Sequence, residues 1–199
     1  MYEGLVTHRT PPEKRARHCE GEFEHYLSEG AVMLAFALHL LRTVPGLKQV
    51  AMHPDGEHGK RFDLQAWLER NGFRKLRGTG RTSYGGEYVS ENGRTLIVDP
   101  SSGRGGDVIA DAGGVSVVAE CKGGVLNTRH SGQTSRLRQG LCETVGLSMA
   151  SPPVPGRRQY VVVPDTPVTE KLARRMLPRV RAAGISIALV DGQGNVRDL

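Results

Sequence analysis

Hydrophobic residues recur with helical spacing near the start of the chain. From about residue 21 to residue 43 they fall at three- and four-residue steps, and Pro45-Gly46 ends the segment. Its second half is apolar on nearly every side, which indicates a helix buried in the domain or in a partner subunit. A second helix is predicted over residues 61–71, with Gly72 as a fitting C-terminal stop.

The middle of the chain has the pattern of β-hairpins. Asn92-Gly93 separates two predicted strands, and Gly113-Gly114 separates two more. The predicted strands cover residues 74–77, 87–90, 95–98, 106–112 and 115–122.

The last third alternates between helices and strands. Helices are predicted over 132–149, with Ser131 as a possible cap, and from Thr166-Pro167 to about residue 183, with a kink at Pro178. Strands are predicted over 160–163 and 185–190. Because the early strands are hairpin-linked and the later ones are joined through helices, we expect an α/β fold around a mixed sheet.

Length and composition restrict the possibilities further. The 199 residues suffice for one sizeable core, and the net charge of +6 makes a polyanionic partner plausible. Three cysteines without CxxC spacing favour a reducing compartment. The polar first 24 residues lack a signal-peptide pattern, and the apolar stretch 31–41 is too short to span a bilayer. We therefore expect a soluble, cytoplasmic protein with an exposed N-terminal arm over residues 1–18 and no membrane association.

The hairpin at Gly113-Gly114 gathers three ionisable residues. With a two-residue turn, paired residue numbers add up to 227, so Asp107 lies opposite Glu120, and Lys122 projects from the same face as Glu120. Facing carboxylates on a strand that is apolar on both sides are costly unless a partner offsets their charge. A hard divalent cation such as Mg²⁺ does so, whereas the simpler alternative is a structural salt bridge through Lys122.

Asp107 followed by Glu120-Cys121-Lys122 resembles the core motif of the PD-(D/E)xK nuclease superfamily. The order of elements over residues 60–194 resembles that of Mrr-type restriction endonucleases in particular. One departure is Gly106, which stands where the family motif has proline before its first acid.

The resemblance implies a restriction-endonuclease-like mixed sheet flanked by helices, with an extra N-terminal helix. Residues 1–59 would form an N-terminal arm and helical extension, and residues 60–199 the nuclease-like core. It further implies a DNA endonuclease that uses Mg²⁺ or Mn²⁺, in restriction, phage defence or mobile-element biology. Asp107 and Glu120 would bind the metal ion, and Lys122 would position or activate water.

The family often adds residues from neighbouring helices. Asp63 is the candidate third metal-binding acid, with Glu22 or Glu29 as the alternative from the long N-terminal helix. Gln133, on the helix after Glu-x-Lys, completes the predicted catalytic set. The candidates for contact with nucleic acid, most plausibly double-stranded DNA, are Arg129, His130 and Arg136.

A second class of function also fits these residues. The chain could be a catalytically silent nucleic-acid-binding or assembly subunit that retains the nuclease fold. A further alternative is an effector whose nuclease is switched by a partner. The apolar N-terminal helix, over residues 21–43, would suit a homodimer or docking to a partner protein.

Overall fold

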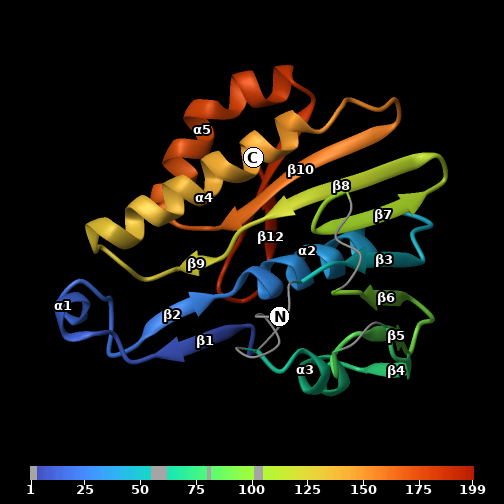
Figure 1. Ribbon diagram of the computed structural model, residues 1–199, viewed down its shortest axis with the longest axis horizontal. Coiled ribbons are helices and arrows are strands. Elements are labelled where there is room, and N and C mark those ends of the chain that lie inside the picture. The colour runs from blue at the N-terminus through green and yellow to red at the C-terminus, as the bar shows by residue number, and fades with distance from the viewer. Residues whose placement is uncertain (1–3, 55–61, 80–81, 101–104) are drawn as a thin grey trace.

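A mixed β-sheet with helices on both faces forms the centre of the molecule (Figure 1). The computed structural model describes residues 4–54, 62–79, 82–100 and 105–199. Within these ranges, nine strands form one sheet and three short strands form another. The prediction of an α/β protein with a mixed sheet flanked by helices is confirmed.

The large sheet has the strand order β12-β11-β10-β8-β7-β3-β6-β5-β4. Strand β10 runs parallel to β8 and β11, and β3 runs parallel to β6, whereas the remaining pairs are antiparallel. Its strands are β3 (Gln49–Met52), β4 (Phe73–Arg77), β5 (Gly86–Ser90), β6 (Thr95–Val98), β7 (Val108–Ala112), β8 (Val115–Cys121), β10 (Arg157–Pro164), β11 (Ile185–Val190) and β12 (Val196–Asp198).

Helix α2 (Glu29–Thr43) covers one face of this sheet, and α4 (Ser131–Ala150) and α5 (Pro167–Ala182) cover the other. Alternating residues of β10 show the division. Val162 belongs to the core that contains α2, whereas Val161 and Val163 belong to the core formed with α4 and α5. A strand apolar on both sides in this way is typical of the interior of a sheet.

The N-terminal segment differs from its prediction. It forms β1 (Val6–Arg9), α1 (Glu13–Ala16) and β2 (Glu24–Leu27), and β2 also pairs with β9 (Gly124–Val125). The predicted exposed arm and the predicted helix start near residue 21 are therefore wrong. Helix α2 begins only at Glu29, because the hydroxyl of Ser28 caps it by accepting the Ala31 N–H at 3.1 Å. The residues before this cap form β2, which pairs with β1 and with the distant β9.

Helix α2 is part of the core of this chain. Its residues from Gly30 to Leu38 are at most 3% exposed where they are hydrophobic, and β3 lies inside the sheet between β7 and β6. The expected division at residue 59 is thus not visible as a boundary between two cores. The apolar surface that we expected to dock against a partner is covered by the chain's own sheet.

Most remaining elements lie close to their predicted positions. Helix α3 (Leu64–Arg70) has the cap Asp63, and α5 begins with Pro167 after the cap Thr166 and continues through Pro178. His130, rather than the expected Ser131, caps α4. Within the described ranges, none of the helices combines the length and the apolar character that a membrane span requires.

Candidate active site

The β7–β8 hairpin has the predicted register. Its paired residues include Ala112 with Val115 and Val108 with Ala119, as a two-residue turn at Gly113-Gly114 requires. Asp107 lies one residue before β7 and outside the paired register, but it is close enough to Glu120 to raise the pKa of that carboxylate. Because Glu120 pairs with Val161 on β10, it projects toward the face that α4 covers.

Backbone hydrogen bonds on two sides hold Asp107 in place. Its N–H donates to the carbonyl of Ala119 at 2.8 Å, and its carbonyl accepts the N–H of His53 at 2.8 Å. Its carboxylate oxygen Oδ2 accepts the N–H of Cys121 at 2.7 Å. The Asp107 carboxylate is therefore fixed against the strand that carries Glu120.

Gly106 allows the chain to approach β8 closely. Its φ is +134°, and a Cβ atom at this position would lie 2.5 Å from Cγ1 of Val118 and 3.2 Å from the carbonyl oxygen of Ala119. Any side chain here would displace the strand neighbours. This contact gives a physical reason for glycine where the family motif has proline.

Glu120 is half-buried in negative surroundings. Burial raises its pKa to about 7, and the carboxylates of Asp107 and Glu29 add to the rise, while Lys122 acts against it. The site therefore favours a proton or a cation on this carboxylate at neutral pH.

Lys122 lies between two further acids. Its ammonium nitrogen is 3.3 Å from Oε2 of Glu29 and 3.1 Å from Oε1 of Glu143. Burial alone would lower the pKa of Lys122, but Glu29 and Glu143 outweigh it and raise the pKa above its usual value. Lys122 is thus a fixed positive charge at neutral pH and not a proton acceptor.

Two glycines shape the surroundings of Lys122. A Cβ atom at Gly123 would lie 2.5 Å from the carbonyl oxygen of Leu27 and 2.6 Å from the amide nitrogen of Glu29, so only glycine lets the end of β8 pass the start of α2. A Cβ atom at Gly140 on α4 would lie 2.9 Å from Cγ of Lys122. These approaches bring Glu29 and α4 to the lysine.

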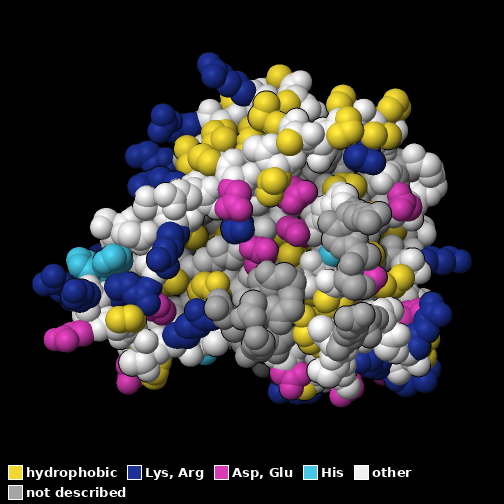
Figure 2. Space-filling view, in the orientation of Figure 1, with side chains coloured by type: hydrophobic (Ala, Val, Ile, Leu, Met, Phe, Trp, Pro, Cys, Tyr) yellow, Lys and Arg dark blue, Asp and Glu magenta, His cyan; other side chains and the backbone are white. Residues whose placement is uncertain are grey.

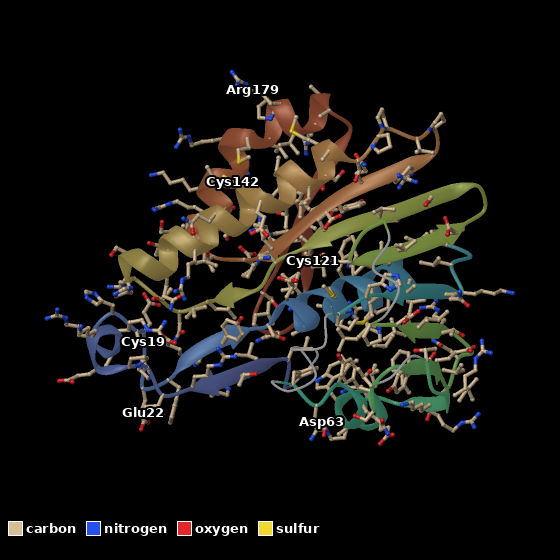
Figure 3. All side chains as sticks on the ribbon, in the orientation of Figure 1. Cys19, Glu22, Asp63, Cys121, Cys142 and Arg179 are labelled. Carbon is tan, nitrogen blue, oxygen red and sulfur yellow. The ribbon has the colours of Figure 1, made fainter. Side chains whose placement is uncertain are left out.

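Acidic and basic side chains meet near the middle of this side of the molecule (Figure 2). Of the candidate third acids, only Glu29 is shown in contact with the Glu-x-Lys residues, through Lys122 and through its effect on Glu120. Glu22 and Asp63 both lie far from Cys121, which follows Glu120 on β8 (Figure 3).

Asp63 has a different role in the structure. Its carboxylate caps α3 by accepting the N–H of Ala66 at 3.0 Å, and α3 lies against β4 at the far edge of the sheet. The structure therefore does not bring Asp63 to the carboxylate pair.

Gln133 is buried in the first turn of α4. Glu143, ten residues further along this helix, is the residue that contacts Lys122, and ten residues of α-helix span about 15 Å. The structure thus places Gln133 away from Lys122 and places Glu143 beside it. Glu143 was not among the predicted site residues, although Gly140 on a predicted amphipathic helix signals a close approach one turn before it.

The three candidates for nucleic-acid contact differ in their exposure and in the bonds they form within the chain. Arg129 forms an ion pair with Glu20 at 2.7 Å, although its side chain is 78% exposed. The ring nitrogen Nδ1 of His130 accepts the N–H of Gly132 at 3.2 Å at the start of α4. Arg136 is exposed on α4 and has no ion pair with a described residue.

The donor set at the hairpin fits a hard cation. Two neighbouring carboxylates offer oxygen ligands, and a cation would offset the burial and the repulsion that together raise the pKa of Glu120. In the described part of the chain, no three His, Cys, Asp or Glu side chains form a ready metal-binding group. Mg²⁺ does not require such a group, because it keeps several waters and takes one or two protein carboxylates.

Comparisons of the chain with protein-family models, curated proteins and solved structures gave no match. The resemblance to the PD-(D/E)xK nucleases therefore rests on the sequence motif.

Proposed function

We propose that this protein is a Mg²⁺- or Mn²⁺-dependent endonuclease with a restriction-endonuclease-like fold. The observation that carries the proposal is the closeness of the Asp107 carboxylate, held by the Cys121 N–H at 2.7 Å, to Glu120, whose pKa it helps to raise. Lys122 follows two residues after Glu120. Two repelling carboxylates beside a fixed ammonium match the needs of phosphodiester hydrolysis, in which charge develops on phosphate oxygens.

Each of the three residues has a distinct task in this proposal. Asp107 and Glu120 would hold the cation, and the Cys121 N–H keeps the Asp107 carboxylate oriented toward it. When bound, the cation would supply Lewis-acid polarisation of the phosphate and a more acidic water. Lys122 stays protonated, so it orients water or neutralises charge on the phosphate rather than accepting a proton.

Glu29 and Glu143 set the position of the Lys122 ammonium through contacts of 3.3 Å and 3.1 Å. Because both carboxylates contact the Lys122 ammonium, we assign them a positioning role. Glu29 is also close enough to raise the pKa of Glu120, so it adds to the negative potential that attracts a cation.

Double-stranded DNA is the proposed substrate, and restriction, phage defence or mobile-element biology the proposed setting. Both follow from the family resemblance. The basic balance of the chain, 27 Lys and Arg against 21 Asp and Glu, supports a polyanionic substrate.

The test is cleavage of plasmid DNA and of RNA by the purified chain with Mg²⁺, with Mn²⁺ or with EDTA. Wild type is expected to cleave DNA only with a divalent cation. Glu120→Ala and Lys122→Ala should each lower the rate by at least about a hundredfold, the usual loss when a charge-stabilising group is removed.

Asp111→Asn is the matched control. Asp111 lies on β7, the strand that follows Asp107, but it is exposed and close to the hairpin turn. This variant should cleave like wild type. Activity that survives both Glu120→Ala and Lys122→Ala would overturn the proposed site.

A catalytically silent DNA-binding subunit is the second candidate function. The observation that favours it is the engagement of Lys122 by two carboxylates, which offset its charge. DNA binding without cleavage under every metal condition would select this function over the first.

A further inference from the structure

The positive charge of the chain is concentrated in one segment. Residues 131–183, which comprise α4, β10 and α5, contain nine Lys or Arg and three Asp or Glu, so this segment carries the net charge of +6. Helices α4 and α5 themselves contain seven of these basic residues and two of the acidic ones. The rest of the chain is balanced. Figure 2 shows basic side chains along the edge formed by these helices, and Arg179 projects outward from α5 (Figure 3).

Three cations of α5 form a regular row. Lys171, Arg175 and Arg179 recur every four residues, so they share one side of the helix with steps of about 6 Å. All three are exposed, and none forms an ion pair with a described residue. Arg174 differs, because Glu170 binds it at 2.7 Å.

The row lies on the same side of the sheet as the candidate site. Glu120 projects toward the face that α4 and α5 cover, and α4 contacts the site through Glu143 and Lys122. Helix α5 lies over β10 and β11, one helix beyond α4. From strand and layer spacings, the row is roughly 20 Å from Glu120.

An extended polyanion fits this surface better than a membrane does. Insertion into lipid requires an apolar helix face, but the apolar side of α5 faces the protein core through Ala173 and Val180, with Leu172, Met176 and Leu177 packed against it. What α5 exposes is a row of cations, which bind phosphates through charge and counterion release.

We infer that the row Lys171, Arg175 and Arg179 binds the phosphate backbone of the nucleic acid whose scissile bond lies at Glu120. This inference rests on the proposed function for its choice of ligand. Duplex DNA carries one charge per about 1.7 Å, so a separation of roughly 20 Å corresponds to about six base pairs. The row therefore contacts only duplexes that extend about six base pairs beyond the site.

The test is binding of fluorescent duplexes by anisotropy, in EDTA and over a salt series. Lys171→Gln/Arg175→Gln/Arg179→Gln should bind a 30-base-pair duplex about tenfold more weakly than wild type does. Its plot of log affinity against log salt should be shallower by up to about 2.7, the value for three lost phosphate contacts. An 8-base-pair duplex, which need not reach the row, should show a much smaller difference between the two proteins.

Lys48→Gln/Arg70→Gln/Arg74→Gln is the matched control. It removes one lysine and two arginines, all exposed and outside α4 and α5, so its net charge equals that of the test variant. It should bind within about threefold of wild type. Thermal unfolding of both variants checks that they are folded.

The outcomes separate this inference from the proposed function. Suppose that wild type cleaves DNA but that both triple variants bind DNA equally well. The inference that the α5 row binds DNA is then wrong, while the proposed nuclease function is supported. If no condition gives cleavage but the α5 variant alone loses binding and salt dependence, the surface stands without the nuclease. Loss of binding to anionic phospholipid vesicles, with DNA binding unchanged, would overturn the surface in favour of a membrane.

Discussion

The two ends of the β7–β8 hairpin carry acidic residues in contrasting surroundings. Near the turn, Asp111 pairs with Ser116 and is exposed. At the open end, Asp107 meets Glu120, and Glu29 and Lys122 approach from the start of α2 and the end of β8. Asp111 lies within β7, whereas Asp107 precedes it and is held by bonds to Ala119 and Cys121.

The difference shows that the hairpin sets the position of a carboxylate, whereas the elements packed around the carboxylate set its pKa. The same two strands and the same turn position both acids. Asp111 at the turn is exposed, whereas Glu120 at the open end is half-buried, and this burial raises the pKa of Glu120 to about 7.

The largest expected effect comes from replacing the glycine beside the open end. Gly106→Ala should destabilise the chain by about 3 kcal/mol or prevent folding, because the new Cβ would overlap Val118 in a backbone conformation that alanine rarely adopts. Urea denaturation measures the loss.

Gly113→Ala at the turn is the control for that substitution. Its φ is +57°, but no atom lies within 4 Å of the added Cβ, so the cost should be only about 1 kcal/mol. Equal losses at Gly106 and Gly113 would contradict the close approach at the open end.

Glu120→Gln should change the pH dependence of stability. The pKa of Glu120 is about 7 in the folded chain and 4.5 ordinarily, so between these values the folded state binds more protons than the unfolded state. Wild-type stability therefore falls as pH rises from 4.5 to 7. The variant should escape this loss and exceed wild type by about 1 kcal/mol above pH 7, a figure reduced for solvent screening.

Urea denaturation at pH 5 and pH 8 makes this comparison. Asp111→Asn, at the turn end, should stay within about 0.5 kcal/mol of wild type at both values. A Glu120→Gln variant that is no more stable than wild type at pH 8 would show that folding does not raise the pKa of Glu120.

Glu143→Gln should have the smallest effect on stability. It removes one of the two carboxylates at Lys122, and because the Glu143 side chain is 53% exposed the loss should be about 0.5 kcal/mol. Chemical denaturation measures it, with exposed Glu91→Gln as control. A loss of 2 kcal/mol or more would assign Glu143 a structural role larger than positioning Lys122.

Local signals in the sequence predicted the hairpin well. A two-residue Gly-Gly turn fixes register, so the pairs from Ala112 with Val115 to Val108 with Ala119 follow from counting residues. Asp107 lies just beyond these pairs, and its bonds to Ala119 and Cys121 could not be counted out in this way. The cap Thr166 with Pro167, and the stop at Gly72 with its φ of +80°, were predictable for the same reason: each depends on neighbouring residues alone.

Features that depend on distant contacts were missed. Strands β1, β2 and β9 are short, and they exist because the segment from Cys19 to His25 is bonded to the loop after β8. Asn127 makes much of this link, donating to the carbonyls of Glu20 and Phe23 and accepting the N–H of His25. No local pattern encodes such pairing, so the helix before residue 43 was predicted to begin too early.

The third acid could not be selected by sequence either. Asp63, Glu22 and Glu29 all lie on predicted helices, and spacing alone does not rank them. The close approach at Gly123, where the end of β8 passes Leu27 and Ser28, brings Glu29 to Lys122, while Asp63 caps a helix at the far edge of the sheet.

We propose that Asp107 and Glu120 together hold a divalent cation. Calorimetric titration of Mn²⁺ at pH 8 tests it most directly, with wild type, Glu120→Gln and Asp111→Asn compared. We predict one bound ion in wild type and in Asp111→Asn, binding roughly tenfold weaker at pH 6 as Glu120 takes up a proton, and no binding in Glu120→Gln. If wild type and Glu120→Gln bind Mn²⁺ equally, Glu120 does not hold the cation and the proposed site is wrong.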